Sequence, residues 1–457
     1  MLIDMHVLRI IVTLLAVLWL GCSTAEIFAA SDQPNIIFLL TDDMGYGDVG
    51  CYGGKFVPTP NIDRLAREGT KFTQFYCMAP VCSPSRVAFL TGMYPGRWRI
   101  TNFLQTRAGN RACEQADFLD PKAPSIARTL KQAGYVTAHF GKWHMGGGRD
   151  VTNAPLFYDY GFDEHAGTYE SPEPDPVITA TNWIFSPEDK IQRGDRSAYF
   201  VDRTLDFLRR HKGQPCYVNL WPDDVHTPWI PTGTDIARRR KENDESEPNF
   251  KAVLLEYDKQ VGRLLAGLKE LGLEQDTILI FSSDNGPMPT LGGRRAGGLR
   301  GSKISLYEGG TRMPLIVRWP GHFPAGRVDD TTIMGGIDFF PMFCKLANVA
   351  LPKNGALDGE DLSESFLGRP VTRQHPLFWE YGRNNSSGFN YPQGRNRSPN
   401  VAVRDGPWKA LVNANGAGAE LYNIDSDRNE SHNVAEANPQ IAKRLTDAAL
   451  QWRKSFP

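Results

Sequence analysis

The sequence predicts an α/β fold with a large, mostly parallel β-sheet sandwiched by helices, followed by a smaller C-terminal α+β domain with an antiparallel sheet. Two observations support this prediction. Between residues 33 and 347, short continuous apolar runs of the kind that strands buried on both faces require alternate with helical patterns. After residue 347 the apolar runs become shorter, turns separate them, and one amphipathic helix follows. We therefore expect a large domain at 33–347 and a smaller domain at 348–457.

Length and composition are compatible with this division. The chain has 457 residues, of which 41% are hydrophobic and 23% are charged, and this is enough for one large globular domain and a smaller one. The net charge is −1, and no basic stripe stands out in the sequence. A nucleic-acid partner is therefore not expected.

The first 25 residues are typical of a signal peptide. An apolar core at 10–20 is too short for a comfortable membrane span, and small residues follow it, so cleavage after Ala25 would place Ser23 and Ala25 in the small-residue positions. This leader predicts export to the periplasm or the exterior. Two alternatives stay open: a lipoprotein signal with lipid on Cys22, which Trp19 fits poorly, and an uncleaved anchor.

Each of four expected strands in the large domain delivers polar residues just past its carboxyl end. These strands are expected at 35–40, 135–140, 215–221 and 277–283, and the polar residues that follow them are, in order, Asp42 and Asp43, Lys142 and His144, His226, and Asp284 and Asn285. In open α/β sheets ligands bind at this edge, so the pattern predicts one shared site.

The remaining elements follow from periodicity. Helical patterns occur at 61–68, 125–133 and 251–271, and a further strand at 314–319 with a helix at 338–347 completes the large domain. In the smaller domain we expect strands at 377–381, 400–404, 408–412 and 420–423, followed by a helix near 438–455.

Cys82 opens the run C-S-P-S-R, in which Pro84 suits the first turn of a short helix and Gly92 suits its end. A nucleophile at Cys82 would lie near the helix N-terminus, where backbone N–H groups and the positive end of the dipole favour an anion. Arg86, one turn further on, adds a fixed positive charge. The alternative interpretation is a buried cysteine beside an ordinary helix cap. The other cysteines show no zinc-type spacing.

The acidic residues at the strand ends suit a hard cation. Asp42 and Asp43 can both turn toward one ion where the chain leaves its strand, and Asp284 with Asn285 offers the same arrangement from another strand. Three carboxylates and one amide oxygen favour Ca²⁺ or Mg²⁺ over zinc. Taken singly, each pair is also compatible with an ordinary turn or helix cap.

Two stretches carry a resemblance to a known family. C-S-P-S-R followed by L-T-G, and G-Y-V-T-A-H-F-G-K-W-H at 134–144, resemble the two signatures of the type I, formylglycine-dependent sulfatases of the alkaline phosphatase-like superfamily. The resemblance spans about residues 35–347. It implies a divalent cation, usually Ca²⁺, held by Asp42, Asp43, Asp284, Asn285 and the formylglycine formed from Cys82.

The resemblance also implies a role for each remaining polar residue. Lys142 and Lys303 would bind sulfate oxygens, and Arg86 would steady the formylglycine. His144 would hold and activate the formylglycine hydrate, and His226 would protonate the leaving oxygen. A ring of positioned cations suits a transition state whose charge is spread over non-bridging oxygens.

The predicted function is hydrolysis of a sulfate ester, most plausibly on a carbohydrate, through a formylglycine hydrate and a covalent sulfoenzyme. A formylglycine-generating enzyme would be the maturation partner. The alternatives are a phosphodiester or phosphonate monoester hydrolase with the same site, and a non-catalytic glycan-binding protein. From loop position alone, five residues are candidates for the mouth of the pocket: Trp98, Arg99, His165, Glu170 and Arg383.

Overall fold

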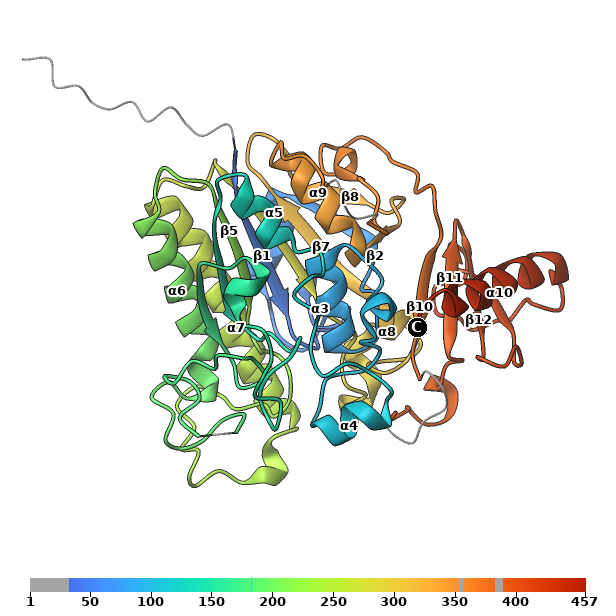
Figure 1. Cartoon of the computed structure of the whole chain (residues 1–457), viewed down its shortest axis with the longest axis horizontal. Helices are drawn as coiled ribbons and strands as arrows, with labels where there is room; N and C mark the ends of the chain where they lie inside the picture. The colour runs from blue at the N-terminus through green and yellow to red at the C-terminus, as the bar shows by residue number, and fades with distance from the viewer. Residues whose placement is uncertain (1–32, 182, 353–356, 383–388) are drawn as a thin grey trace, which may run out of the picture. The chain divides into compact units, whose positions relative to one another are not determined.

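The computed structural model, which describes residues 33–457 other than 182, 353–356 and 383–388, contains the predicted large sheet and small sheet (Figure 1). The predicted signal peptide, Cys22 and Arg383 lie outside the described residues. Within them, no helix combines the length and the apolar character needed to cross a bilayer. The six cysteines in this part of the chain are all free thiols.

The large sheet is mostly parallel, as predicted. Its strand order is β4-β3-β5-β1-β6-β7-β2-β8, and β9 pairs with β2. The pairs from β4 through β6 are parallel, whereas β7 runs antiparallel to both β6 and β2. The strands are β1 Asn35–Thr41, β2 Thr70–Tyr76, β3 Val136–Gly141, β4 Glu164–Gly167, β5 Cys216–Trp221, β6 Thr277–Ser283, β7 Arg312–Arg318, β8 Arg327–Asp329 and β9 Met334–Gly335.

Strand β1 shows why a continuous apolar run suits the centre of this sheet. Its side chains alternate between two cores: Ile36 and Phe38 pack on one face, and Ile37 and Leu39 on the other. The first face is covered by α3 Cys82–Thr91, α5 Ile126–Gln132 and α9 Phe339–Leu346 (Figure 1). The second face is covered by α2 Pro60–Glu68, α6 Arg196–Arg210 and α7 Glu247–Glu270. Two further short helices are α4 Arg107–Ala112 and α8 Glu308–Thr311.

The small sheet is antiparallel, in the order β10-β11-β12-β13. Its strands are β10 Leu377–Glu380, β11 Val401–Asp405, β12 Trp408–Val412 and β13 Glu420–Asn423, and α10 Pro439–Lys454 packs on β11 and β12. Residues 33–457 form one compact unit by their contacts. The boundary between residues 347 and 348 therefore stays a prediction.

A buried ionic cluster joins the small sheet to the large one. Lys409 on β12 contacts Glu308 of α8 at 2.8 Å and Glu430 at 3.1 Å, and all three side chains are buried. Arg312 and Tyr76 also contact Glu308, at 3.1 and 2.9 Å. Lys409 belongs to the small sheet, and Glu308 begins α8, which leads directly into β7 of the large sheet. The cluster therefore ties the two sheets together.

The structure adds elements that the sequence analysis did not predict, chiefly β2, β4 and α6. α6 has a clear signal, because its buried residues Phe200, Val201, Phe207 and Leu208 recur at helical spacing. The alternation of apolar and polar residues is weaker in β2, which lies toward the edge of the sheet beside the short strands β8 and β9.

Candidate active site

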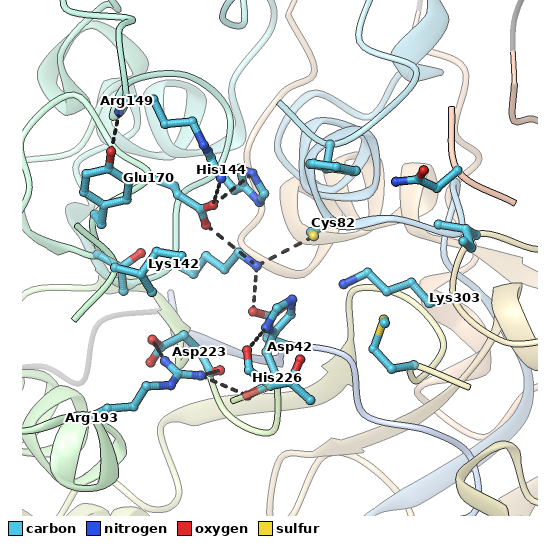
Figure 2. Close-up of a pocket in the computed structure, with 18 residues that line it drawn as sticks. Asp42, Cys82, Lys142, His144, Arg149, Glu170, Arg193, Asp223, His226 and Lys303 are labelled. Carbon is cyan, nitrogen blue, oxygen red and sulfur yellow. Dashed lines mark hydrogen bonds and ion pairs between the residues drawn. The ribbon is translucent and has the colours of Figure 1, made fainter. Parts of the chain in front are cut away.

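The predicted strand-end residues meet at one edge of the large sheet. Asp42 and Asp43 follow β1, Lys142 follows β3, and Asp284 and Asn285 follow β6, all of them at most 4% exposed. His226 comes from the loop after β5, and Lys303 from the loop before α8. Figure 2 shows most of these side chains around Cys82.

Cys82 is the first residue of α3, so the sulfur lies at the N-terminus of a ten-residue helix. The residue before it, Val81, has an extended backbone and makes no side-chain cap. The first N–H groups of α3 are therefore left without a side-chain acceptor, which favours an anion at this point. Gly92 ends the helix with a left-handed φ of 66°, and a Cβ at this position would lie 2.6 Å from Phe340.

Lys142 reaches the Cys82 sulfur because of the backbone at the end of β3. Gly141 has φ of 123°, and a Cβ there would lie 1.9 Å from the carbonyl oxygen of Trp221. This close approach lets the Lys142 N–H donate to the same carbonyl at 2.7 Å. The side chain then places Nζ 3.6 Å from Cys82 Sγ and 2.7 Å from Asp42 Oδ2.

Each buried carboxylate of the cluster faces a cation. Lys303 Nζ lies 2.7 Å from both oxygens of Asp43, and Arg86 Nη2 lies 2.7 Å from Asp284. Arg86 also donates to the carbonyl of Lys142 at 2.7 Å and lies 3.4 Å from Asp42. Arg86 therefore connects α3 to the ends of β1, β3 and β6.

The charges around these carboxylates shift their pKa values in different directions. Burial raises the pKa of Asp42, but Lys142 and His226 outweigh it and hold that pKa well below the usual range. The pKa of Asp43 is also lowered, because Lys303, together with His226, outweighs the effect of burial. For Asp284, burial dominates over Arg86, and the pKa rises to about 7. A bound cation would favour the charged form of all three.

Two buried oxygens in this cluster have no hydrogen-bond partner among the described residues: Asp42 Oδ1 and Asn285 Oδ1. The Asn285 amide donates to Asp43 at 2.7 Å, which leaves its oxygen free to accept or to bind an ion. Oδ1 or Oδ2 atoms of Asp42 and Asp284 and the sulfur of Cys82 lie within 4.8 Å of one another. Unpaired buried oxygens are costly unless an ion or water satisfies them, so the donor set fits a hard divalent cation.

The backbone at this edge is strained in two places. Asp43 has φ of 58° and His144 has φ of 54°, values that non-glycine residues rarely adopt. Local contacts hold both: the Asp43 N–H donates to Asp284 at 3.1 Å, and the His144 N–H donates to the Glu170 carbonyl at 2.9 Å. Such positions cluster at functional sites, because the surrounding structure has to maintain them.

Two histidines flank the sulfur position. His226 Nε2 lies 3.5 Å from Asp43, and its Nδ1 contacts the Thr227 carbonyl. His144 Nε2 lies 3.1 Å from the Leu104 carbonyl, and its Nδ1 is buried without a partner among the described residues. Burial lowers the pKa of both rings, that of His144 to about 3. Burial also raises the pKa of the Cys82 thiol to about 11, so the unmodified thiol keeps its proton at neutral pH.

These groups border a cavity of about 330 Å³. Of the predicted residues, Asp42, Cys82, Lys142, His144, His226 and Lys303 line it. The other predicted residues, Asp43, Arg86, Asp284 and Asn285, lie behind this layer and are completely buried. The structure thus brings the ten residues predicted for catalysis or metal binding into one cluster.

The predicted mouth of the pocket needs correction. Of the candidates, Glu170 lines the cavity, whereas Trp98, Arg99 and His165 do not. Trp98 packs against the core, Arg99 contacts the Glu114 carbonyl at 3.4 Å, and His165 stacks on Phe157. Loop position places a residue near the strand ends but does not decide which way its side chain packs.

Sequence reasoning missed several lining residues. Arg149 pairs with Glu170 at 2.8 Å, and Arg193 pairs with Asp223, which also contacts Arg196 at 3.0 Å. Asp223 comes shortly after β5, where the strand-end rule could have found it. Arg149 comes from a turn and Arg193 from a three-residue 3-10 helix just before α6, where no periodic pattern marks them.

A helix N-terminus, two ammonium groups and a carboxylate cluster that fits a divalent cation, all around one cavity, suit in-line transfer of a tetrahedral oxyanion group. This places the chain in the class of hydrolases that act on anionic esters. Residues 34–349 match the family described as sulfatase, and residues 302–455 match the family described as N-sulphoglucosamine sulphohydrolase, C-terminal. The chain belongs to the sulfatase family, whose members hydrolyse sulfate esters.

Relatives of known activity agree with this assignment. The chain is 29% identical to an N-acetylgalactosamine-6-O-sulfatase of Bacteroides thetaiotaomicron, over 91% of this chain and 92% of the relative. It is also 29% identical to human arylsulfatase A, over 92% and 88% of the two chains. A solved structure from a study of glycosaminoglycan metabolism by Bacteroides thetaiotaomicron superimposes with a TM-score of 0.75 at 26% identity, covering 93% of this chain and all of the other.

Proposed function

We propose that the protein hydrolyses a sulfate ester of a carbohydrate, with the side chain of residue 82 as nucleophile after oxidation of Cys82 to formylglycine. The convergence of Lys142, Lys303 and the N-terminus of α3 on the Cys82 side chain is the observation that carries this proposal. The three groups offer positive charge from separate elements to an anion bound at residue 82. A sulfate group has the charge and the tetrahedral shape that such an arrangement accommodates.

The residues around the cavity divide the chemical tasks. Lys142 and Lys303 bind non-bridging sulfate oxygens, and Arg86, which is buried against Asp284, steadies residue 82 through the first turn of α3. His226 donates a proton to the oxygen of the leaving alcohol. His144, in its neutral form, accepts a proton from residue 82.

Formylglycine supplies two hydroxyl groups on one carbon when its aldehyde is hydrated. One hydroxyl oxygen of residue 82 forms a bond to sulfur while the bond from sulfur to the leaving alcohol oxygen breaks. The second hydroxyl then loses its proton, the carbonyl forms again, and the bond to the sulfate oxygen breaks. Addition of water to the carbonyl completes the cycle.

A divalent cation, Ca²⁺ with Mg²⁺ as the alternative, would be held by Asp42, Asp43, Asp284, Asn285 and residue 82. The oxygens of Asp42 and Asn285 that have no hydrogen-bond partner among the described residues support this donor set. The cation would supply Lewis-acid stabilisation of negative charge on a sulfate oxygen. Oxygen ligands of this kind favour Ca²⁺ or Mg²⁺ over zinc.

The relatives narrow the substrates that are worth testing first. The relatives named N-acetylgalactosamine-6-sulfatase, from bacterium to human, support a sulfated amino sugar as the substrate class. The apolar N-terminal segment supports export to the periplasm or the exterior, with lipid attachment at Cys22 as the alternative. A formylglycine-generating enzyme would act on Cys82 during maturation.

One experiment tests the nucleophile and the reaction together. The protein is co-expressed with a formylglycine-generating enzyme, the state of residue 82 is determined by mass spectrometry, and hydrolysis of aryl sulfate, aryl phosphate and aryl phosphonate esters is compared. We expect an aldehyde at residue 82 and a higher kcat/KM for the sulfate ester than for the other two. Full activity with an unmodified thiol would refute the nucleophile, and stronger turnover of the phosphonate would refute the reaction.

A further inference from the structure

The cavity has a carboxylate beside its sulfate-binding groups that the proposed reaction does not use. Glu170 lines the cavity, its side chain is 13% exposed, and Figure 2 shows it next to Lys142 and His144. Its Oε1 accepts a hydrogen bond from Arg149 Nη2 at 2.8 Å and lies 3.5 Å from His144 Nε2. A negative charge so near a site for an anion opposes binding of that anion, so the carboxylate calls for an explanation.

The second oxygen of Glu170 is available to a ligand. Lys142 Nζ lies 4.0 Å from this oxygen, which is beyond hydrogen-bond distance, and none of the hydrogen bonds among the described residues reaches it. Interactions with His144, Lys142 and Arg149 lower the pKa of Glu170 far enough that it is ionised at neutral pH. An ionised, partly exposed carboxylate oxygen is a strong acceptor for hydroxyl donors.

Each lysine and arginine on the cavity wall has an acidic partner, three of which line the cavity while Asp43 lies behind it. Among the described lining residues, the four lysine and arginine side chains each have an acidic partner: Lys142 with Asp42, Lys303 with Asp43, Arg149 with Glu170, and Arg193 with Asp223. The first two pairs belong to the sulfate-binding groups. In the other two pairs, the arginine charge is balanced by Glu170 or Asp223, so neither pair offers a net positive charge to a second anionic group on the substrate.

We propose that Glu170, oriented by Arg149, selects a neutral, hydroxyl-bearing sugar ring as the carrier of the sulfate ester. Its Oε2 accepts a hydrogen bond from a ring hydroxyl, and its charge disfavours a second sulfate or a carboxylate on the same ring. This inference rests on the proposed function and concerns the substrate class of that site. Attraction to the right group and repulsion of the wrong one act together, as specificity commonly requires.

Arg149 is the positioning residue in this arrangement. Besides its hydrogen bond to Glu170, the guanidinium donates to the Leu104 carbonyl at 3.3 Å, and the backbone N–H of Arg149 donates to the Tyr169 hydroxyl at 2.9 Å. These contacts fix the guanidinium, which in turn holds Oε1 of Glu170. Oε2 is then directed to the side of the cavity that borders Lys142.

The test uses full-length protein with formylglycine at residue 82 and saturating Ca²⁺. The substrates are the 6-sulfates of galactose, N-acetylgalactosamine and N-acetylglucosamine, the disulfated form of each sugar, and 4-nitrophenyl sulfate as a substrate without ring hydroxyls. The variant E170Q keeps the shape of the side chain and removes its charge. The matched control is E173Q on the same segment, because Glu173 contacts the Phe157 N–H and His165 and does not line the cavity.

The measured quantities are ratios of kcat/KM within each variant, which cancel any loss common to all substrates. For the wild type we expect kcat/KM for at least one monosulfated sugar to exceed that for its disulfated form by about tenfold or more. A factor of this size corresponds to the loss of one charge-assisted hydrogen bond. E170Q should reduce this preference by about tenfold and lower turnover of the sugar sulfate relative to the aryl sulfate by about tenfold. E173Q should keep both ratios of the wild type.

Each other outcome overturns the inference. Equal losses on all substrates in E170Q would mean that Glu170 only supports His144 and Lys142. A wild-type preference for disulfated sugars, or hydrolysis of the aryl sulfate without that of any sugar sulfate, would show that the cavity does not select a neutral ring. Failure of the proposed function is distinct, because the enzyme with formylglycine and Ca²⁺ would then not hydrolyse the aryl sulfate either.

Discussion

Replacing Lys142 by Met removes an ammonium group that lies 3.6 Å from the Cys82 sulfur, and it keeps a long side chain in the same buried space. The change leaves Lys303 and the N-terminus of α3 in place. Asp42 loses its partner at 2.7 Å but keeps Arg86 at 3.4 Å. The substitution therefore tests one of the three positive groups near residue 82.

The expected magnitude follows from the distance. A unit charge about 4 Å from a sulfate oxygen contributes about 4 kcal/mol at an effective dielectric constant of about 20. Loss of one donor to a developing oxyanion commonly lowers kcat by about 100- to 1,000-fold. We expect a fall of this size in kcat for 4-nitrophenyl sulfate, with a smaller rise in KM, because the charge on the non-bridging oxygens is best matched in the transition state.

The assay compares proteins with the same formylglycine content, measured by mass spectrometry, at saturating Ca²⁺. The control is Lys131→Met, which removes a partly exposed lysine of α5 that pairs with Asp163. It should leave kcat unchanged. Thermal unfolding of both variants separates a loss of folded protein from a loss of chemistry. A Lys142→Met variant that is folded and keeps more than about a third of the wild-type kcat/KM would refute the assigned role, because the expected loss is so much larger.

Three further predictions concern the cation, the nucleophile and the junction between the sheets. Exhaustive chelation should abolish activity, and Ca²⁺ or Mg²⁺ but not zinc should restore it. Asp284→Ala should weaken Ca²⁺ binding, measured by calorimetry, and lower kcat as well. Full activity of that variant after chelation would mean that the carboxylate cluster is structural. Cys82→Ser, made in a host that leaves serine unmodified, should release at most one equivalent of alcohol and retain a sulfate group at residue 82, since it lacks a second hydroxyl to expel sulfate; sustained turnover would contradict the mechanism. Lys409→Met should lower the free energy of unfolding by about 3–5 kcal/mol, because Glu430 loses its buried cation and Glu308 loses one of two, Arg312 staying at 3.1 Å, and an unchanged urea midpoint would contradict this.

The sequence analysis located most of the large sheet because its strands are buried on both faces. The run at 35–40 became β1, and the runs at 135–140, 215–221 and 277–283 became β3, β5 and β6 within one or two residues. The same argument did not reveal that β7 runs antiparallel to β6. Strand direction depends on how the connecting segment crosses the sheet, and an apolar run carries no information about that.

The signatures around Cys82 and Lys142 identified the chemistry from local sequence. The strand-end rule then explained how Asp42, Asp284 and Lys142 meet, because parallel neighbours end at the same edge of a sheet. Trp98, Arg99 and His165 show the limit of the rule. Trp98 ends a short 3-10 helix, Arg99 caps it and His165 belongs to β4, and their side chains pack against the core or neighbouring groups and do not line the cavity.

By itself, the sequence determined the fold class, and it predicted a nucleophile position and a set of acidic and basic groups around it, since each depends on a contiguous motif or on a strand and the residues directly after it. The tertiary structure decided which charges pair, so that Lys142 faces Asp42, Lys303 faces Asp43, and Arg149 faces Glu170. It also decided that, beyond the groups proposed to bind sulfate, the charges on the cavity lining are balanced, Arg149 by Glu170 and Arg193 by Asp223. These pairs join residues from separate strands and loops, and the packing of the whole domain sets the few ångströms that make a neighbouring charge a partner.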